Sequence, residues 1–144
     1  MSLLSDRDEQ ALREHLASLG KPVTLLFFTQ TIGAPESVIL ARQVLDEVAG
    51  LNELIRVEEI NFVLERDRAA QYGIERIPAI ALLSDGEDAR MRFFGAPAGY
   101  EFMSLIEAVM LAGTDDSRLT AESRELISSH VTGPLDIQVF VTPT

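Results

Sequence analysis

The sequence predicts an α/β domain with a mixed four-stranded sheet and helices on both faces, on three observations. Residues 1–113 alternate short apolar runs with helical segments. A strand–helix–strand stretch in the first half predicts a parallel pair, because a crossover connection joins strands that run the same way. Asp85-Gly86, between two later apolar runs, indicates an antiparallel hairpin. Only a mixed sheet covered by helices buries all of these surfaces.

The first predicted helix covers residues 5–19. Ser5 and Asp8 have the spacing of a capping box, leucines follow on one face, and Gly20 ends the helix. The run 23–29 is continuously apolar and has turn residues on both sides. It is too short for a favoured helix, so it predicts a strand that is buried on both faces.

A loop over residues 30–35 leads into a helix that extends to about residue 49. Pro35 suits the first helical position, where its missing N–H costs nothing. Apolar residues recur on two faces of this segment, so we expect a helix packed on more than one side. The first face holds Val38, Leu45 and Val48, and the second holds Ile39, Leu40 and Val44.

The second half of the domain supplies the remaining elements. These are a strand at 54–61, a polar helix at about 63–72, strands at 77–83 and 90–94, and a helix with Phe102, Leu105, Ile106 and Val109 on its inner face. Gly73 is a natural left-handed residue for the end of the polar helix. The complete order, α-βαβα-ββα, is that of the thioredoxin/glutaredoxin-like fold.

The character of the sequence changes after residue 113. A polar linker precedes a short helix capped by Thr120, and Gly133-Pro134 ends that helix. Residues 137–142 have the pattern of another strand. We interpret residues 114–144 as a linker helix and the first strand of a truncated second unit. We expect the strand to join a sheet edge or an apolar surface, within the chain or across a symmetric homodimer.

Composition excludes several classes of function. A formal net charge of −11 argues against nucleic acid and anionic membranes as partners. No apolar run is long enough to span a bilayer and the first residues do not have the pattern of a secretory leader, so we expect a cytoplasmic protein. The absence of cysteine excludes disulfides, zinc–thiolate sites and iron–sulfur clusters. His15 and His130 lack metal-ligand spacing, so neither a metal nor a cofactor is expected.

Three segments carry a resemblance to a known family. Residues 93–102, with Arg92 before them, resemble the R-x-Y-G-x-P-x-G-x-E-F signature of the glutaredoxin-like protein disulfide oxidoreductases. Residues 72–78 are similar to the thioredoxin-superfamily segment Y-G-[VI]-x-x-[IVT]-P, whose proline is cis, so we expect a cis Ile77–Pro78 bond. Residues 139–144 resemble the strand that this family places before Cys-Pro-Tyr-Cys in its second unit.

The resemblance implies that residues 1–113 are the first of two tandem thioredoxin folds. The redox-motif positions would then be Ile32, Gly33, Ala34 and Pro35, without either cysteine. A more distant relative, the N-terminal domain of the alkyl hydroperoxide reductase flavoproteins, also lacks CxxC in its first fold and keeps its dithiol in the second. The implied function is a redox-inactive N-terminal module of a thiol–disulfide oxidoreductase, whose catalytic CxxC lies outside this chain.

Two other functions remain open. An inert fold could hold extended peptides as a chaperone or adaptor, with the backbone at Ile77 and Pro78 offered for strand addition and Ile32 and Ala34 as an apolar floor. A third alternative is a relay domain that delivers electrons from a reductase. A polypeptide client or a reductase is the partner expected through the parent protein. Thr31 has no base beside it in sequence, so we interpret it as a helix-capping residue rather than a nucleophile.

Overall fold

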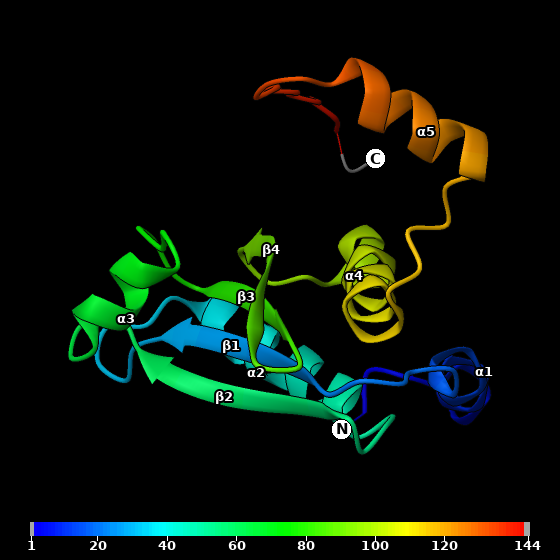
Figure 1. Ribbon diagram of the computed structural model, residues 1–144. Coiled ribbons are helices and arrows are strands. Elements are labelled where there is room, and N and C mark those ends of the chain that lie inside the picture. Colours follow the sequence, from blue (N-terminus) through cyan, green and yellow to red (C-terminus); the bar gives the residue numbers. More distant parts are fainter. Residues whose placement is uncertain (1, 143–144) are drawn as a thin grey trace. The chain divides into compact units, whose positions relative to one another are not determined.

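The computed structural model describes residues 2–142, and the chain divides into two compact units, residues 1–114 and 115–144 (Figure 1). The elements of unit 1 are α1 (Asp6–Leu16), β1 (Val23–Thr29), α2 (Glu36–Ala49), β2 (Ile55–Asn61), α3 (Arg66–Gln71), β3 (Ala79–Ser84), β4 (Glu87–Phe94), the 3₁₀ turn η1 (Gly99–Glu101) and α4 (Phe102–Thr114). Unit 2 contains α5 (Ala121–His130).

The predicted mixed four-stranded sheet is confirmed, with the strand order β2-β1-β3-β4. β1 runs parallel to β2 and antiparallel to β3, and β3 pairs antiparallel with β4. In the register, Leu25 lies between Val57 of β2 and Leu82 of β3. β1 therefore has a hydrogen-bonded neighbour on each side and runs through the middle of unit 1 (Figure 1).

Two hydrophobic cores sandwich the sheet. The larger core takes side chains from α1, α2 and α4, and the smaller core lies on the side of α3. Successive residues of β1 point to opposite faces, so Phe27 belongs to the larger core and Phe28 to the smaller one. Both rings are at most 1% exposed. Burial on both faces explains why the β1 sequence is continuously apolar.

Helix α2 differs from the sequence expectation in two ways. It begins at Glu36, so Pro35 is its N-cap residue with an extended backbone and not its first helical residue. The expected second packed face is wrong, because Ile39 is 72% exposed and Leu40 is 39% exposed. Val44, predicted on that face, instead lies in the larger core. One side of α2 rests on the sheet, and no described residue of unit 1 buries the other.

Local turn chemistry moves several predicted boundaries. Asp85 and Gly86 both have positive φ, 48° and 85°, and form a two-residue hairpin turn. Pairing therefore resumes at Glu87, three residues before the predicted start of β4. The Asn61 side-chain oxygen accepts hydrogen bonds from the backbone N–H groups of residues 63 and 64, at 3.0 Å each, and this turn delays α3.

Unit 2 forms its predicted helix but not its predicted strand. The Thr120 hydroxyl oxygen accepts a hydrogen bond from the Ser123 N–H at 3.1 Å and caps α5. Residues 137–142 pair with no described strand, and the side chains of Ile137, Val139 and Phe140 are 76–89% exposed. These residues form no strand, because a strand requires a partner for its backbone, and their joining to a sheet edge or an apolar surface stays a prediction. The homodimer stays a prediction.

Arg92 of β4 ties the hairpin to the segment that precedes Pro78. Its Nε donates to the Tyr72 carbonyl at 3.0 Å, and its two terminal nitrogens donate to the Asp88 carboxylate at 2.8 and 2.6 Å. The guanidinium also lies 5.6 Å from the centre of the Tyr72 ring, which in turn packs against Phe28. The arginine of the family signature therefore has a structural partner within this domain.

Gly113 should be a stability hot spot, because a Cβ there would lie 2.3 Å from Leu19 Cδ2 and 3.2 Å from Val23 Cγ2. Its carbonyl accepts the Gly20 N–H at 2.9 Å, so the backbones already approach closely. We expect Gly113→Ala to lower the free energy of unfolding by about 1–3 kcal/mol in urea titrations. Gly133→Ala, with open space around it, is the matched control. Equal stabilities for the two variants would contradict the packing argument.

The Arg92–Asp88 pair should make acid stability depend on Asp88. Hydrogen bonding from Arg92 holds the pKa of Asp88 below its ordinary value, against the next-largest effect, burial, which raises it; the backbone hydrogen bond from Arg90 lowers it further. A lowered pKa in the folded state stabilises the fold above the unfolded pKa of about 3.9, and this contribution is lost as the pH falls through the folded pKa.

We therefore expect Asp88→Asn to lower the free energy of unfolding at pH 7 by at most about 1 kcal/mol, since the pair is partly solvated. The difference from the parent chain should shrink as the pH falls from about 4, the ordinary pKa of an aspartate, through the lower pKa of Asp88 in the folded chain. Urea titrations from about pH 2.5 to 7 measure it, with Asp85→Asn in the hairpin turn as the control. A difference independent of pH would contradict the assignment.

Candidate functional site

The predicted redox loop lies between the end of β1 and the start of α2. The Ile32 side chain is 90% exposed, whereas Ala34 packs against the larger core. Gly33 has φ +69°, a left-handed conformation that suits glycine, and its carbonyl accepts a hydrogen bond from Gln30 Nε2 at 3.2 Å. Pro35 closes the loop as the N-cap of α2. The loop is thus an ordered turn whose tip presents an isoleucine.

The structure brings the second predicted segment to the same end of the sheet. Phe28 of β1 pairs with Ala79 of β3, so the chain leaves β1 beside the point where residues 77 and 78 enter β3. The Ile77–Pro78 peptide bond is cis. Pro78 is buried, and its carbonyl accepts the Gly95 N–H at 2.9 Å, while Ile77 is partly buried against the smaller core.

The turn after β2 also borders this region, which the sequence pattern did not predict. Val63 and Leu64, in the turn after β2, line a hollow of about 420 Å³ together with Asn61 and the loop residues Gln30, Thr31 and Ile32. Leu64 is 81% exposed and Val63 is 47% exposed. The parallel pairing of β1 and β2 places their carboxyl ends at one edge, so the topology could have indicated this neighbour.

The hollow contains no group that could perform thiol exchange. The chain has no cysteine, and neither histidine lines the hollow. His15 instead contacts Glu107 at 3.1 Å between α1 and α4. Thr31 is exposed at the rim of the hollow. The arrangement offers an apolar surface with a few amide and hydroxyl groups, which suits binding rather than covalent chemistry.

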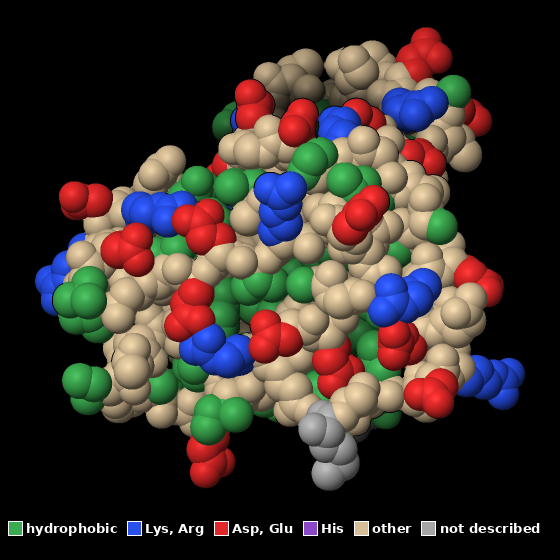
Figure 2. All heavy atoms as spheres, turned by 90° about the horizontal axis from the view of Figure 1, so that it is seen from below, with side chains coloured by type: hydrophobic (Ala, Val, Ile, Leu, Met, Phe, Trp, Pro, Cys, Tyr) green, Lys and Arg blue, Asp and Glu red, His purple; other side chains and the backbone are tan. Residues whose placement is uncertain are grey.

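Elsewhere on unit 1 the charged groups serve structure. Arg42 of α2 donates to both carboxylate oxygens of Glu59 on β2 and lies 5.5 Å from the centre of the Phe27 ring. Hydrogen bonding to Arg42 lowers the pKa of Glu59, against the opposing effect of burial. On the face in Figure 2, Lys and Arg lie among Asp and Glu rather than apart from them.

Residues 2–142 also lack two other kinds of functional feature. No cluster of three or more His, Asp or Glu side chains there could hold a metal ion. None of the helices in that part of the chain is long and apolar enough to cross a membrane.

Comparison with known proteins identifies relatives, although no family model matches the chain. The alkyl hydroperoxide reductase protein AhpF from Xanthomonas campestris is 31% identical over 100 residues, which are 67% of this chain and 18% of that protein. The Escherichia coli AhpF is 25% identical over 138 residues, 96% of this chain and 24% of that protein. A probable thioredoxin from Methanothermobacter thermautotrophicus is 33% identical over 72 residues, 49% of this chain and 79% of that protein. The chain thus spans about a fifth of the two AhpF proteins it matches.

Solved structures agree with these relatives. The Enterococcus faecalis AhpF superposes with a TM-score of 0.79 at 32% identity, over 86% of this chain and 59% of that one. A protein disulfide oxidoreductase from Aeropyrum pernix superposes with a TM-score of 0.72 at 25% identity, over 87% of this chain and 54% of that one. AhpF, which the sequence motifs placed as the more distant relative, thus matches with the higher identity and TM-score.

The fold, the position of the loop and these relatives agree. The chain belongs to the thioredoxin-like family that includes the N-terminal domain of AhpF and the protein disulfide oxidoreductases, and it is a member without the cysteines of the CxxC motif.

Proposed function

We propose that this chain is the redox-inactive first module of a glutaredoxin-like thiol–disulfide oxidoreductase, and that a CxxC in a following thioredoxin-like unit carries the chemistry. The module would support and orient that unit and extend its surface toward a polypeptide client or a reductase. The match to the E. coli AhpF supports the proposal, because 138 aligned residues exceed the length of unit 1 and must include part of unit 2. A cytoplasmic location belongs to the same proposal.

The observation that carries the proposal is that the sequence and helix cap of unit 2 resemble those at the beginning of unit 1. In both α1 and α5 a leucine precedes an N-cap residue with a hydroxyl group. The Ser5 hydroxyl accepts the Asp8 N–H at 3.2 Å, and the Thr120 hydroxyl accepts the N–H of the residue three positions later at 3.1 Å. In each unit a glycine–proline connector then leads to an apolar run that ends in threonine. The matched runs are Leu25-Leu26-Phe27-Phe28-Thr29 and Gln138-Val139-Phe140-Val141-Thr142.

The matched side chains differ in burial. Phe27 and Phe28 are at most 1% exposed, whereas their counterparts Phe140 and Val141 are 89% and 82% exposed. Burying one such side chain contributes about 1.5–3 kcal/mol. Residues 115–142 therefore carry the apolar surface of an α1–β1 pair without the helices and strands that cover it in unit 1. A following thioredoxin-like unit would cover it in the same way.

The requirements of thiol exchange decide which of the two units performs the chemistry. A thiolate attacks one sulfur of a disulfide, the other sulfur leaves, and a second thiol then resolves the mixed disulfide. Neither thiol exists in this chain, so both must come from the following unit. The first unit keeps the four-stranded platform and presents Ile32 where the first thiol would stand.

A peptide-binding chaperone or adaptor is the alternative. The exposed side chains of Ile32 and Leu64, with Ile77 and Pro78 at the neighbouring strand end, favour it, because an extended peptide could lie across this edge. This alternative does not account for the repeated start of a fold in unit 2, so it takes second place. A relay domain for electrons would share the CxxC requirement of the main proposal.

The coding sequence downstream of Thr144 tests the proposal directly. Aligning the two runs places the counterpart of Ile32 directly after Thr144, so we expect Cys-x-x-Cys as the next four residues. The longer protein should reduce insulin disulfides in the presence of dithiothreitol, and a variant with both cysteines changed to serine should not. The 144-residue chain should be inactive in the same assay. A downstream sequence without the motif would overturn the proposal in favour of the peptide-binding alternative.

Restored thiols would show how much redox geometry the loop keeps. Ile32 stands four positions before the first residue of α2, so a thiol there should titrate near the free value of about 8.5. A thiol at the N-cap position 35 faces the free N–H groups of α2 and should titrate a few tenths to about one unit lower. Ultraviolet absorbance of the thiolate in Ile32→Cys and Pro35→Cys measures both.

Glu36, next to position 35, is a negative charge that opposes the effect of the helix. Pro35→Cys combined with Glu36→Gln should therefore lower the thiol pKa further, and this variant is the matched control. A thiol at position 32 with the lower pKa of the two would contradict this description of the loop, and would mean that α2 still acts on the first redox position.

A further inference from the structure

A second apolar hollow lies between the N-terminal arm, α2 and α4. It has a volume of about 300 Å³ and is lined by Leu3, Leu4, Leu40, Val44, Ala98 and Phe102, and by Glu47. We call it the α2–α4 groove. It shares no lining residue with the redox-loop hollow. The Glu47 carboxylate accepts the backbone N–H groups of residues 3 and 4, which fixes the arm as one wall.

Large apolar side chains extend from the groove onto the surface. Leu3, which lines the groove, is 49% exposed. Tyr100 and Met103, which follow the lining residues Gly99 and Phe102 in sequence, are 80% and 48% exposed. Leu40 in the wall is 39% exposed, and its neighbour Ile39 is 72% exposed. Exposed apolar side chains beside an apolar hollow, on a protein with a net charge of −11, indicate a place where another molecule docks.

The charges around the groove are acidic. Glu36 lies four residues before Leu40, on the same side of α2, and Glu101 lies in η1 between two lining residues. Residues 22–41, 43–55 and 93–117 contain no Lys or Arg. Arg42, the one cation of α2, is paired with Glu59 on β2.

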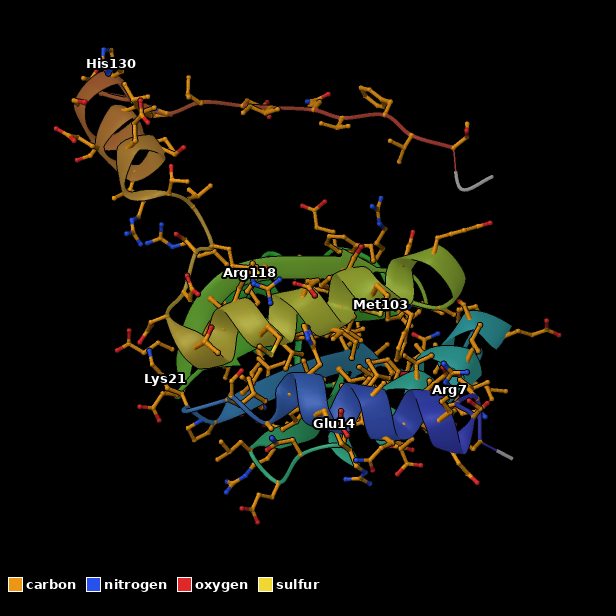
Figure 3. All side chains as sticks on the ribbon, turned by 90° about the vertical axis from the view of Figure 1, so that its right-hand side faces the viewer. Arg7, Glu14, Lys21, Met103, Arg118 and His130 are labelled. Carbon is orange, nitrogen blue, oxygen red and sulfur yellow. The ribbon has the colours of Figure 1, made fainter. Side chains whose placement is uncertain are left out.

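Arg76 is engaged with the Phe94 ring, 4.6 Å from its centre. Arg7 of α1 lies at the same end of unit 1 as Met103 of α4 (Figure 3). It stands between Asp6 and Asp8 in the first turn of α1, so that turn also carries a net negative charge. The rim of the groove therefore attracts a cationic partner. A second copy of this chain would bring the same acidic rim against itself across a twofold axis, which is unfavourable.

We propose that the α2–α4 groove docks an amphipathic helix of a partner protein, with Lys or Arg beside its apolar face. A groove between two helices with an apolar floor suits the helix-in-groove mode of recognition. The apolar residues of the partner fill the groove, and its cations face Glu36 and Glu101. This site is separate from the redox loop, so it does not depend on the function proposed above.

The test uses the full chain and three synthetic peptides of about 16 residues, long enough for four helical turns. The first has leucines at positions i, i+3, i+4 and i+7 of a helix with lysines elsewhere, the second has the same composition scrambled, and the third has glutamate in place of lysine. Binding is followed by tyrosine fluorescence, because the chain has no tryptophan and Tyr100 is one of only two tyrosines. Amide chemical shifts of the ¹⁵N-labelled chain locate the site.

We expect the first peptide to bind at least about tenfold more tightly than the other two at about 0.15 M salt, where long-range charge effects are largely screened. Its shift changes should be confined to residues 2–4, α2, η1 and the first turns of α4. Leu40→Gln should weaken binding at least about fivefold. Leu111→Gln, which changes a leucine of α4 with the same 39% exposure that does not line the groove, should leave the affinity within about twofold.

The acidic rim has a separate test. Glu36→Gln with Glu101→Gln should weaken the first peptide and flatten the salt dependence of its affinity, because fewer charges then face the partner. Circular dichroism checks that each variant is folded. Equal binding of the scrambled peptide, or shift changes spread over all acidic surfaces, would overturn the proposal. So would an unchanged affinity in folded Leu40→Gln.

Discussion

The structure of unit 1 depends on the burial of β1 on both of its faces. Phe27 fills the core under α1, α2 and α4, and Phe28 fills the core on the side of α3. With β2 on one side and β3 on the other, every residue of β1 is buried except Thr24, which is half-buried. Such a strand requires two layers of helices and two neighbouring strands, and the elements around it supply them.

The same requirement explains the character of unit 2. Residues 139–141 have apolar side chains in consecutive positions, as β1 does, and therefore on both faces of an extended chain. Residues 115–142 of unit 2 themselves supply neither neighbouring strands nor covering layers for these residues. A segment of this kind is stable only inside a sheet that other residues complete, which is why we propose a following unit rather than a free tail.

The loop over residues 30–35 has a fixed place in the fold that does not depend on any thiol. The register of β1 against β3 brings the loop and Pro78 to one end of the sheet, and Arg92 holds the segment before Pro78 through the Tyr72 carbonyl. These contacts belong to the packing of the domain and need no thiol. The start of α2 at Glu36, by contrast, leaves position 32 outside the helix.

The sequence by itself determined the element order, the central strand and the absence of thiol chemistry, because apolar periodicity and composition are local properties that need no partner. The positions of Ile32 and Pro78 at one edge followed from motif resemblance and agree with the register. Tertiary structure decided what depends on neighbours. It left Ile39 exposed, because nothing described packs over that side of α2, and it formed no strand over residues 137–142. It also assembled the redox-loop hollow and the α2–α4 groove from segments far apart in the chain, which no local pattern contains.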